Sequence, residues 1–85
     1  MTGQPMRNRD LEITETEDGI VIYQPERDRV HTLNASASVI LELCDGTRSV
    51  AEIALELAAV FGLDSVPTEE TDRCIALLAA EGLLG

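Results

Sequence analysis

Residues 33–53 read LNASASVILELCDGTRSVAEI and predict the end of a strand followed by two short helices. Asn34 is a favoured helix N-cap because its side chain can accept a hydrogen bond from a free amide of the first turn. After this cap, apolar residues recur through Cys44 at the i, i+3, i+4, i+7 spacing of one helix face. Asp45 and Gly46 are expected to end the first helix with a left-handed cap.

A second helix is predicted directly after this turn. Ser49 and Glu52 form a Ser-x-x-Glu capping box, in which each side chain accepts a hydrogen bond from the other residue's backbone amide. Gly62 is expected to end the helix. One apolar stripe runs along it, made of Val50, Ile53, Ala54, Leu57, Ala58 and Phe61. This pattern predicts a helix that buries one face against a core.

A third helix is predicted near the C-terminus. Pro67 lies near its start, where a missing amide costs little, and Asp64 or Ser65 is expected to cap it. Gly82 is expected to end it, and the two leucines that follow should fold back on the core. The first turn is acidic and the next turns carry the apolar stripe, with Glu69, Glu70 and Asp72 followed by Ile75, Leu78 and Ala79.

The first part of the chain predicts strands instead. Residues 10–15 alternate between apolar and polar, as a half-buried strand does, and residues 20–24, IVIYQ, should form the central strand. A third strand is expected at residues 29–33. Short connections predict an antiparallel meander. The order βββααα therefore predicts an α+β domain over residues 10–85, with its helices on one sheet face, after a flexible tail at residues 1–9.

The charge balance limits the possible partners. The net charge is -10, with sixteen acidic residues against six arginines. A field of this sign repels phosphate backbones, so we expect no nucleic acid partner. It favours basic peptides or basic protein surfaces as partners. The same net charge is also expected if the acidic residues serve only to keep a small protein soluble.

Neither a membrane span nor a secretory signal is predicted. No stretch approaches ~20 apolar residues, and residues 1–19 lack an apolar run. We therefore expect a cytoplasmic protein in which Cys44 and Cys74 stay reduced as small apolar helix residues. Because His31 is the only histidine and the cysteines are not closely paired, no metal site is predicted.

No pattern predicts an enzyme or a cofactor. The acidic residues are scattered, and no glycine-rich phosphate loop is present. Residues 62–66, GLDSV, are similar to the Asp-Ser motif of acyl carrier proteins, in which Ser65 would carry a phosphopantetheine arm. Strands are predicted where such a carrier needs a long helix, and this argues against the alternative.

The strand predicted at residues 29–33 has an outer edge that no obvious segment covers. An uncovered edge presents free amides and carbonyls to another peptide. Arg29, His31 and Thr32 make this edge polar, which discourages self-pairing while leaving the backbone accessible. The sequence therefore predicts a site for strand addition, in a monomer or a weak dimer.

Several runs of residues carry a resemblance to a known family. These are VHTLN at 30–34, ILELCDGTRSV at 40–50, EI at 52–53 and GLL at 82–84. Over residues 11–84 the chain resembles the PqqD family, the small peptide chaperones of pyrroloquinoline quinone biosynthesis. More widely, it is similar to the leader-recognition domains that serve ribosomally made, post-translationally modified peptides.

The resemblance implies a winged-helix-like fold and a role without catalysis. A protein of this kind binds the leader of a precursor peptide and presents it to a modifying enzyme, often a radical S-adenosylmethionine enzyme. The leader would add as a strand to residues 29–33, in a cleft whose other wall is the third helix. The peptide-binding residues implied are Arg29, Val30, His31, Thr32, Leu33, Glu70, Arg73, Cys74 and Leu77.

Two questions stay open at this level. The acids of the third helix either recognise Lys or Arg in a leader or form a solvated helix face. The chain could also be an adaptor that binds a partner enzyme without any peptide substrate. Glu70 falls where the family often has an acid, whereas Cys74 falls where a larger apolar residue is common.

Overall fold

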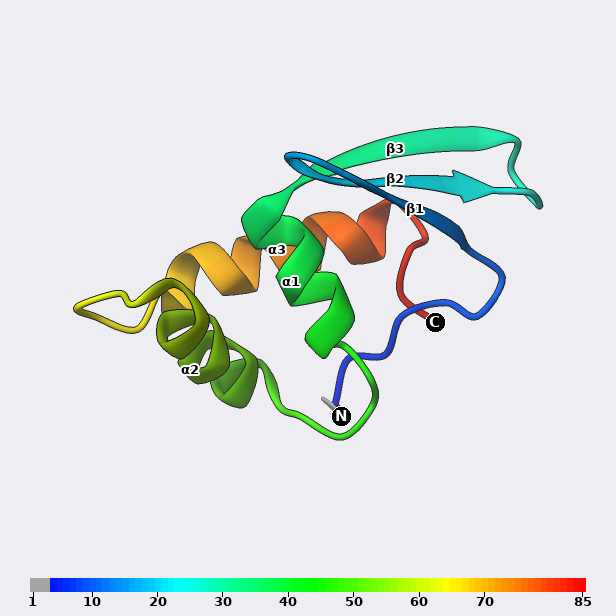
Figure 1. Cartoon of the computed structure of the whole chain (residues 1–85). Coiled ribbons are helices and arrows are strands. Elements are labelled where there is room, and N and C mark those ends of the chain that lie inside the picture. Colours follow the sequence, from blue (N-terminus) through cyan, green and yellow to red (C-terminus); the bar gives the residue numbers. More distant parts are fainter. Residues whose placement is uncertain (1–3) are drawn as a thin grey trace.

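The computed structural model describes residues 4–85 and contains three strands followed by three helices (Figure 1). The strands are β1 (Glu12–Thr16), β2 (Gly19–Gln24) and β3 (Arg29–Asn34). The helices are α1 (Ala35–Leu43), α2 (Val50–Phe61) and α3 (Thr68–Ala80). The predicted α+β fold and its element order are confirmed.

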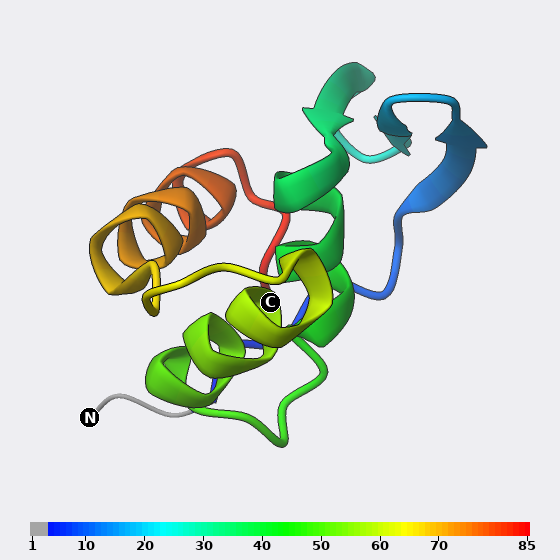
Figure 2. The same cartoon turned by 60° about the vertical axis from the view of Figure 1, so that its left-hand side comes forward.

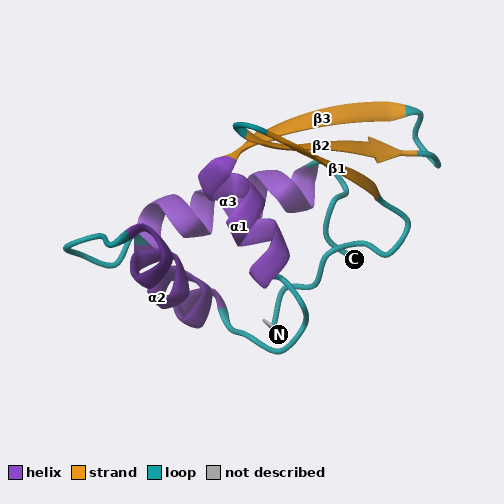
Figure 3. Cartoon of the chain, in the orientation of Figure 1, coloured by secondary structure: helices purple, strands orange, loops and turns teal. Residues whose placement is uncertain are grey.

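The strands form one antiparallel sheet in the order β1-β2-β3, with β2 in the centre as predicted. Ile22 of β2 lies opposite Ile13 of β1 and His31 of β3. The sheet lies on one side of the molecule and the helices lie on the other (Figure 3). α1 contacts β2 and β3 but not β1. For this reason β1 is exposed along its whole length, and the half-buried first strand expected from its alternation is wrong.

The core lies between β2 and the helices. α1 is at its centre, packed against the sheet on one side and against α2 and α3 on the other (Figure 2). The buried apolar cluster comprises Ile20, Ile22, Ile40, Leu41, Cys44, Ile53, Leu57, Leu78 and Leu83. Leu83 is in this cluster because the chain folds back after α3, as expected.

Local signals placed most helix ends correctly. The Asn34 side chain accepts a hydrogen bond from the Ala37 amide at 2.9 Å and caps α1. Ser49 and Glu52 form the reciprocal capping box of α2. Gly62 ends α2 in a left-handed conformation, with a φ of 61°. Each of these signals is contained within a few residues of sequence.

The end of α1 differs from the prediction. Cys44 is its C-cap, with a φ of -79° and a ψ of 69°, so the cap is not left-handed. Gly46 has a φ of 85°, but it belongs to the turn that follows. In that turn the Asp45 carboxylate accepts hydrogen bonds from the amide and the hydroxyl of Thr47.

The start of α3 also differs. Pro67 occupies the N-cap position, and no side chain caps the helix, so the expected cap by Asp64 or Ser65 is wrong. Residues 68–70 at the start of α3 are exposed. Water can therefore satisfy the free amides of this helix end without a side-chain cap.

Two predicted apolar stripes turn out to be placed differently. On α3, Thr71 is fully buried while Ala79 is exposed, because the inward face runs through Thr71, Ile75 and Leu78. On α2, Phe61 retains 42% of its surface exposed at the end of the stripe.

The N-terminal segment is held more closely than the expected tail. Residues 5–8 form backbone hydrogen bonds with the loop after α1, where the Arg7 amide donates to the Cys44 carbonyl at 2.7 Å. They also pair with residues 83–85 on the other side. Residues 5–8 are therefore hydrogen-bonded to two other segments of the fold, while residues 1–3 of the predicted tail lie outside the described residues. Among the described residues, no helix is both long and apolar enough to cross a membrane.

Candidate functional site

The outer edge of β3 is unpaired within the described residues. β3 pairs with β2, and no other segment of residues 4–85 forms a bridge or a backbone hydrogen bond with it. Alternate amides and carbonyls of an edge strand point away from its neighbour. Residues 29–34 therefore offer a row of backbone groups for another extended chain.

One face of α3 lies on the same side of the molecule as this edge. Glu70, Cys74, Leu77 and Glu81 are spaced so that they form one stripe along the helix. At its C-terminal end, Glu81 Oε2 lies 3.5 Å from Nδ1 of His31 in β3. At its N-terminal end, Glu70 and Cys74 line a pocket that also includes the start of α1. The stripe thus runs beside β3 and its continuation into α1.

His31 links β3 to the rest of the fold instead of extending from the surface. Its side chain is only 11% exposed, and its Nε2 lies 2.6 Å from Oε1 of Gln24. The Gln24 amide in turn donates to the Gly82 carbonyl at 3.1 Å. Sequence reasoning missed Gln24, although it is the last inward position of the alternating strand β2. His31 would therefore meet a peptide mainly through its backbone.

The register of the sheet divides the remaining predicted residues of β3 between two faces. Arg29 and Leu33 lie opposite Gln24 and Ile20 and share the inner face with His31, whereas Val30 and Thr32 lie on the outer face. Leu33 packs against the core. Val30 is 65% exposed and is the largest apolar side chain on the outer face of β3.

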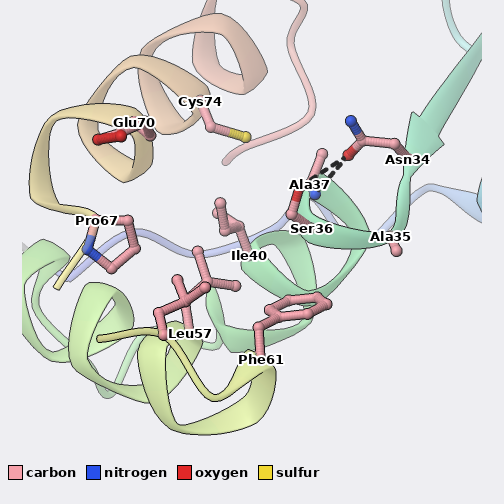
Figure 4. A pocket seen from close by; sticks show the side chains of 11 residues that line it. Asn34, Ala35, Ser36, Ala37, Ile40, Leu57, Phe61, Pro67, Glu70 and Cys74 are labelled. Carbon is pink, nitrogen blue, oxygen red and sulfur yellow. Dashed lines mark hydrogen bonds between the residues drawn. The ribbon is translucent and has the colours of Figure 1, made fainter. Parts of the chain in front are cut away.

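A pocket of about 740 Å³ opens between the three helices just beyond the end of β3 (Figure 4). We call it the helical pocket. It begins at Asn34 and the first turn of α1, and Glu70 lies on its α3 wall. Figure 4 shows the Cys74 side chain directed from α3 toward that first turn. Its large apolar and sulfur-containing lining residues are Ile40, Leu57, Phe61, Leu63, Pro67 and Cys74.

The structure brings together only some of the residues predicted on α3. Glu70 and Cys74 line the helical pocket, whereas Arg73 and Leu77 do not. Arg73 forms an ion pair with Glu69 at 3.8 Å in which both side chains are exposed. Leu77 is 66% exposed on the stripe between the pocket and β3. The contribution of α2 to the pocket was missed, because periodicity placed Phe61 in the core.

The two cysteines are free thiols, and neither is an activated nucleophile. Burial raises the pKa of Cys44 to about 11. Burial also raises the pKa of Cys74. Both side chains therefore stay protonated at neutral pH, whereas the thiolate is the form that attacks or binds metal. Residues 4–85 contain no cluster of three potential metal ligands.

Comparison with solved structures shows the same fold in a known complex. The chain matches a structure described as TbiB1 in complex with the TbiA(beta) leader peptide, with a TM-score of 0.68 over 93% of each chain. Sequence identity is 20%. At this identity the similarity establishes the fold.

Comparison with sequences gives the family. Relatives described as PqqA binding protein, from Xanthomonas oryzae pv. oryzae strains KACC10331 / KXO85 and PXO99A, are 44% and 42% identical to the chain over 59 residues. The match covers 69% of this chain and 62% of the length of those relatives. The model of the family described as coenzyme PQQ synthesis protein D (PqqD) matches residues 19–84. This chain belongs to the PqqD family.

Proposed function

We propose that this chain binds the leader of a ribosomally synthesised precursor peptide by strand addition and presents it to a modifying enzyme, with a radical S-adenosylmethionine enzyme as the first candidate. The observation that carries the proposal is the unpaired β3 edge with the α3 stripe beside it. The proposed role is non-enzymatic.

The relatives support the peptide part of this proposal. Proteins similar to this chain are described as binding PqqA, and the matched structure holds a leader peptide. The ligand named in that structure is a leader peptide, and the unpaired edge of this chain is suited to an extended peptide. A precursor leader of this class is therefore the ligand that we propose.

Strand addition explains how one small domain could bind a peptide with selectivity. Main-chain hydrogen bonds to β3 would supply affinity, and the side chains on alternate faces would supply selectivity. One face of the added strand would lie toward the α3 stripe. For binding, we propose the β3 residues Arg29, Val30, His31, Thr32 and Leu33 and the α3 residues Glu70, Arg73, Cys74 and Leu77.

Presentation would follow from tethering. A leader held on β3 keeps the rest of the precursor near any enzyme bound to the same chain, which raises its effective concentration at the active site. The chain would thereby promote modification without contributing a catalytic group.

The experiment is an amide-shift titration of the full chain. The probes are synthetic PqqA and the strongest binder selected from a displayed library of short random peptides. We expect shifts concentrated in residues 29–34 and along α3. If neither probe binds, or if the shifts lie elsewhere, the proposal is wrong, and failure to bind any peptide would favour the adaptor alternative.

A pair of matched variants sharpens this test. Leu77 and Leu55 are both exposed helix leucines, at 66% and 58%, but only Leu77 lies on the α3 stripe. Leu77→Glu should weaken peptide binding because it places a charge beside the added strand. Leu55→Glu on α2 should leave binding unchanged, and equal effects of the two variants would contradict the assignment of the α3 wall.

A further inference from the structure

The helical pocket extends the candidate site beyond the sheet edge. It begins at Asn34, which is the last residue of β3, and it ends at α2 and the loop that follows. A peptide paired with β3 that continues past Asn34 would reach the pocket mouth. The pocket is therefore continuous with the proposed binding edge, although it is built from helices.

The lining of the pocket is suited to an apolar side chain. Figure 4 shows Ile40 and Leu57 close together and the Phe61 ring beside the first turn of α1. On the α1 side, Asn34 Oδ1 already accepts hydrogen bonds from the Ala37 amide and the Ser36 hydroxyl. Few polar groups remain to hold a polar ligand, and a pocket of this size and composition favours large apolar groups.

The rim of the pocket exposes apolar surface that a ligand would cover. Phe61 and Leu63 are 42% and 45% exposed, although both line a pocket that also includes Ile40 and Leu57. Covering such surface is favourable in proportion to the area removed from water. A bound side chain would complete a core that these two residues leave open.

The charge at the rim indicates which kind of residue should lie next to the bound apolar side chain in the peptide. Glu70 lies on the α3 wall, and within residues 4–85 it forms no ion pair, whereas the neighbouring Glu69 pairs with Arg73. The chain has a net charge of -10. A basic ligand is attracted to this rim, while a second copy of the chain would be repelled by the same field.

We infer that the helical pocket receives a large aliphatic or aromatic side chain of the bound peptide, and that Glu70 selects a Lys or Arg next to it. This inference rests on the proposed function and adds a motif to it. The recognised segment would be an extended stretch followed, beyond the end of β3, by an apolar anchor beside a basic residue. α2 would then take part in recognition through Phe61.

The experiment selects displayed random peptides on the full chain and on four variants. Phe61→Ala and Glu70→Gln change the pocket. Val60→Ala and Glu69→Gln are matched controls, because both residues are exposed neighbours that do not line the helical pocket. Each variant is first checked for an unchanged fold by its thermal unfolding, and Leu63→Ala serves as a second pocket variant if Phe61→Ala unfolds.

Peptides selected on the wild type should share a large apolar residue beside a Lys or Arg. Replacing that anchor by Ala in the best peptide should weaken binding to the wild type about ten- to hundredfold. The same replacement should weaken binding to Phe61→Ala much less. Peptides selected on Glu70→Gln should keep the large apolar residue but no longer favour a Lys or Arg beside it. The control variants should select the wild-type motif.

The outcomes separate this inference from the proposed function. If peptides shift the β3 amides but the anchor replacement costs the same in Phe61→Ala and the wild type, the inference is overturned and strand addition stands. If the pocket variants abolish only self-association of the chain, the occupant is a second copy and the inference is again overturned. If no selected peptide shifts the β3 amides, both proposals fail.

Discussion

Thr71 shows how a single buried atom affects this small fold. The residue is fully buried on α3, and its Oγ1 has no hydrogen-bond partner among the described residues. A buried hydroxyl without a partner is destabilising, because it loses its hydrogen bonds to water. Thr71→Val replaces the hydroxyl with a methyl group and should raise the free energy of unfolding by about 1 kcal/mol in chemical denaturation. Thr71→Ser keeps the hydroxyl and should give no gain, so stabilisation by both variants would contradict this explanation.

Glu52 gives a specific reason for the fold to lose stability at low pH. The Ser49 amide donates to the Glu52 carboxylate at 2.8 Å and holds the pKa of Glu52 below its usual 4.5. A carboxyl group with a lowered pKa stabilises the fold above the unfolded-state pKa and loses that effect as the pH falls through the folded-state pKa. The free energy of unfolding should therefore differ most between the wild type and Glu52→Gln at neutral pH, and the difference should shrink below pH 4.5.

A control on the same helix isolates this effect. Glu56 is exposed on α2, and none of the side-chain hydrogen bonds of the described residues involves it. Glu56→Gln removes a carboxylate from the same helix without removing a hydrogen bond, so at neutral pH Glu52→Gln should lose more stability than Glu56→Gln. Equal losses in the two variants would show that the capping bond does not contribute to the pH dependence of stability.

At the scale of elements, Gly19 holds the β1–β2 turn against the end of β3. Its φ is 157°, and a Cβ added there would lie 1.9 Å from the Leu33 carbonyl oxygen. Gly19→Ala should lower the free energy of unfolding by about 2 kcal/mol or more, because backbone must move to relieve the clash. Gly62 also has a positive φ, of 61°, but nothing lies within 4 Å of its added Cβ. Gly62→Ala should therefore cost only about 1 kcal/mol in the same denaturation measurement, and equal losses would refute the close approach at Gly19.

The elements also show what the sequence could and could not predict. Asn34, Ser49 and Glu52 form caps within one turn of helix, so their roles follow from neighbouring residues alone. Periodicity also identified the central strand and the βββααα order. Periodicity did not show which element packs against each apolar stripe. Phe61 fits the α2 pattern, but α1 and α3 do not cover it completely, and it lines the helical pocket instead.

Features that join distant segments were missed, in addition to the local caps at the end of α1 and the start of α3. Residues 5–8 pair with the loop after α1 and with the C-terminal segment, so no local pattern marks them. The helical pocket likewise combines residues from three helices. The β3 edge was predictable because a short meander leaves its last strand on the outside unless a later segment returns to it.

In the domain as a whole, the backbone pairing of the terminal segments lies apart from the proposed binding surface. The terminal segments close the side of the domain near the end of α1, while the β3 edge, the α3 stripe and the helical pocket lie together on another part of the surface. A peptide could therefore bind without displacing any backbone pairing of the described residues. This arrangement predicts that binding stabilises the chain and leaves its fold unchanged.

Pairing of a peptide backbone with β3 can be tested by methylating the backbone amides of the ligand. The strongest peptide from the displayed library is synthesised with one N-methyl group at each position in turn, and each affinity is measured by calorimetry with the full chain. Strand addition predicts an alternation: methylation at every second residue of the paired segment removes a donor facing β3 and weakens binding about tenfold or more, while the residues between tolerate it. Binding that shows no two-residue period would contradict strand addition to β3.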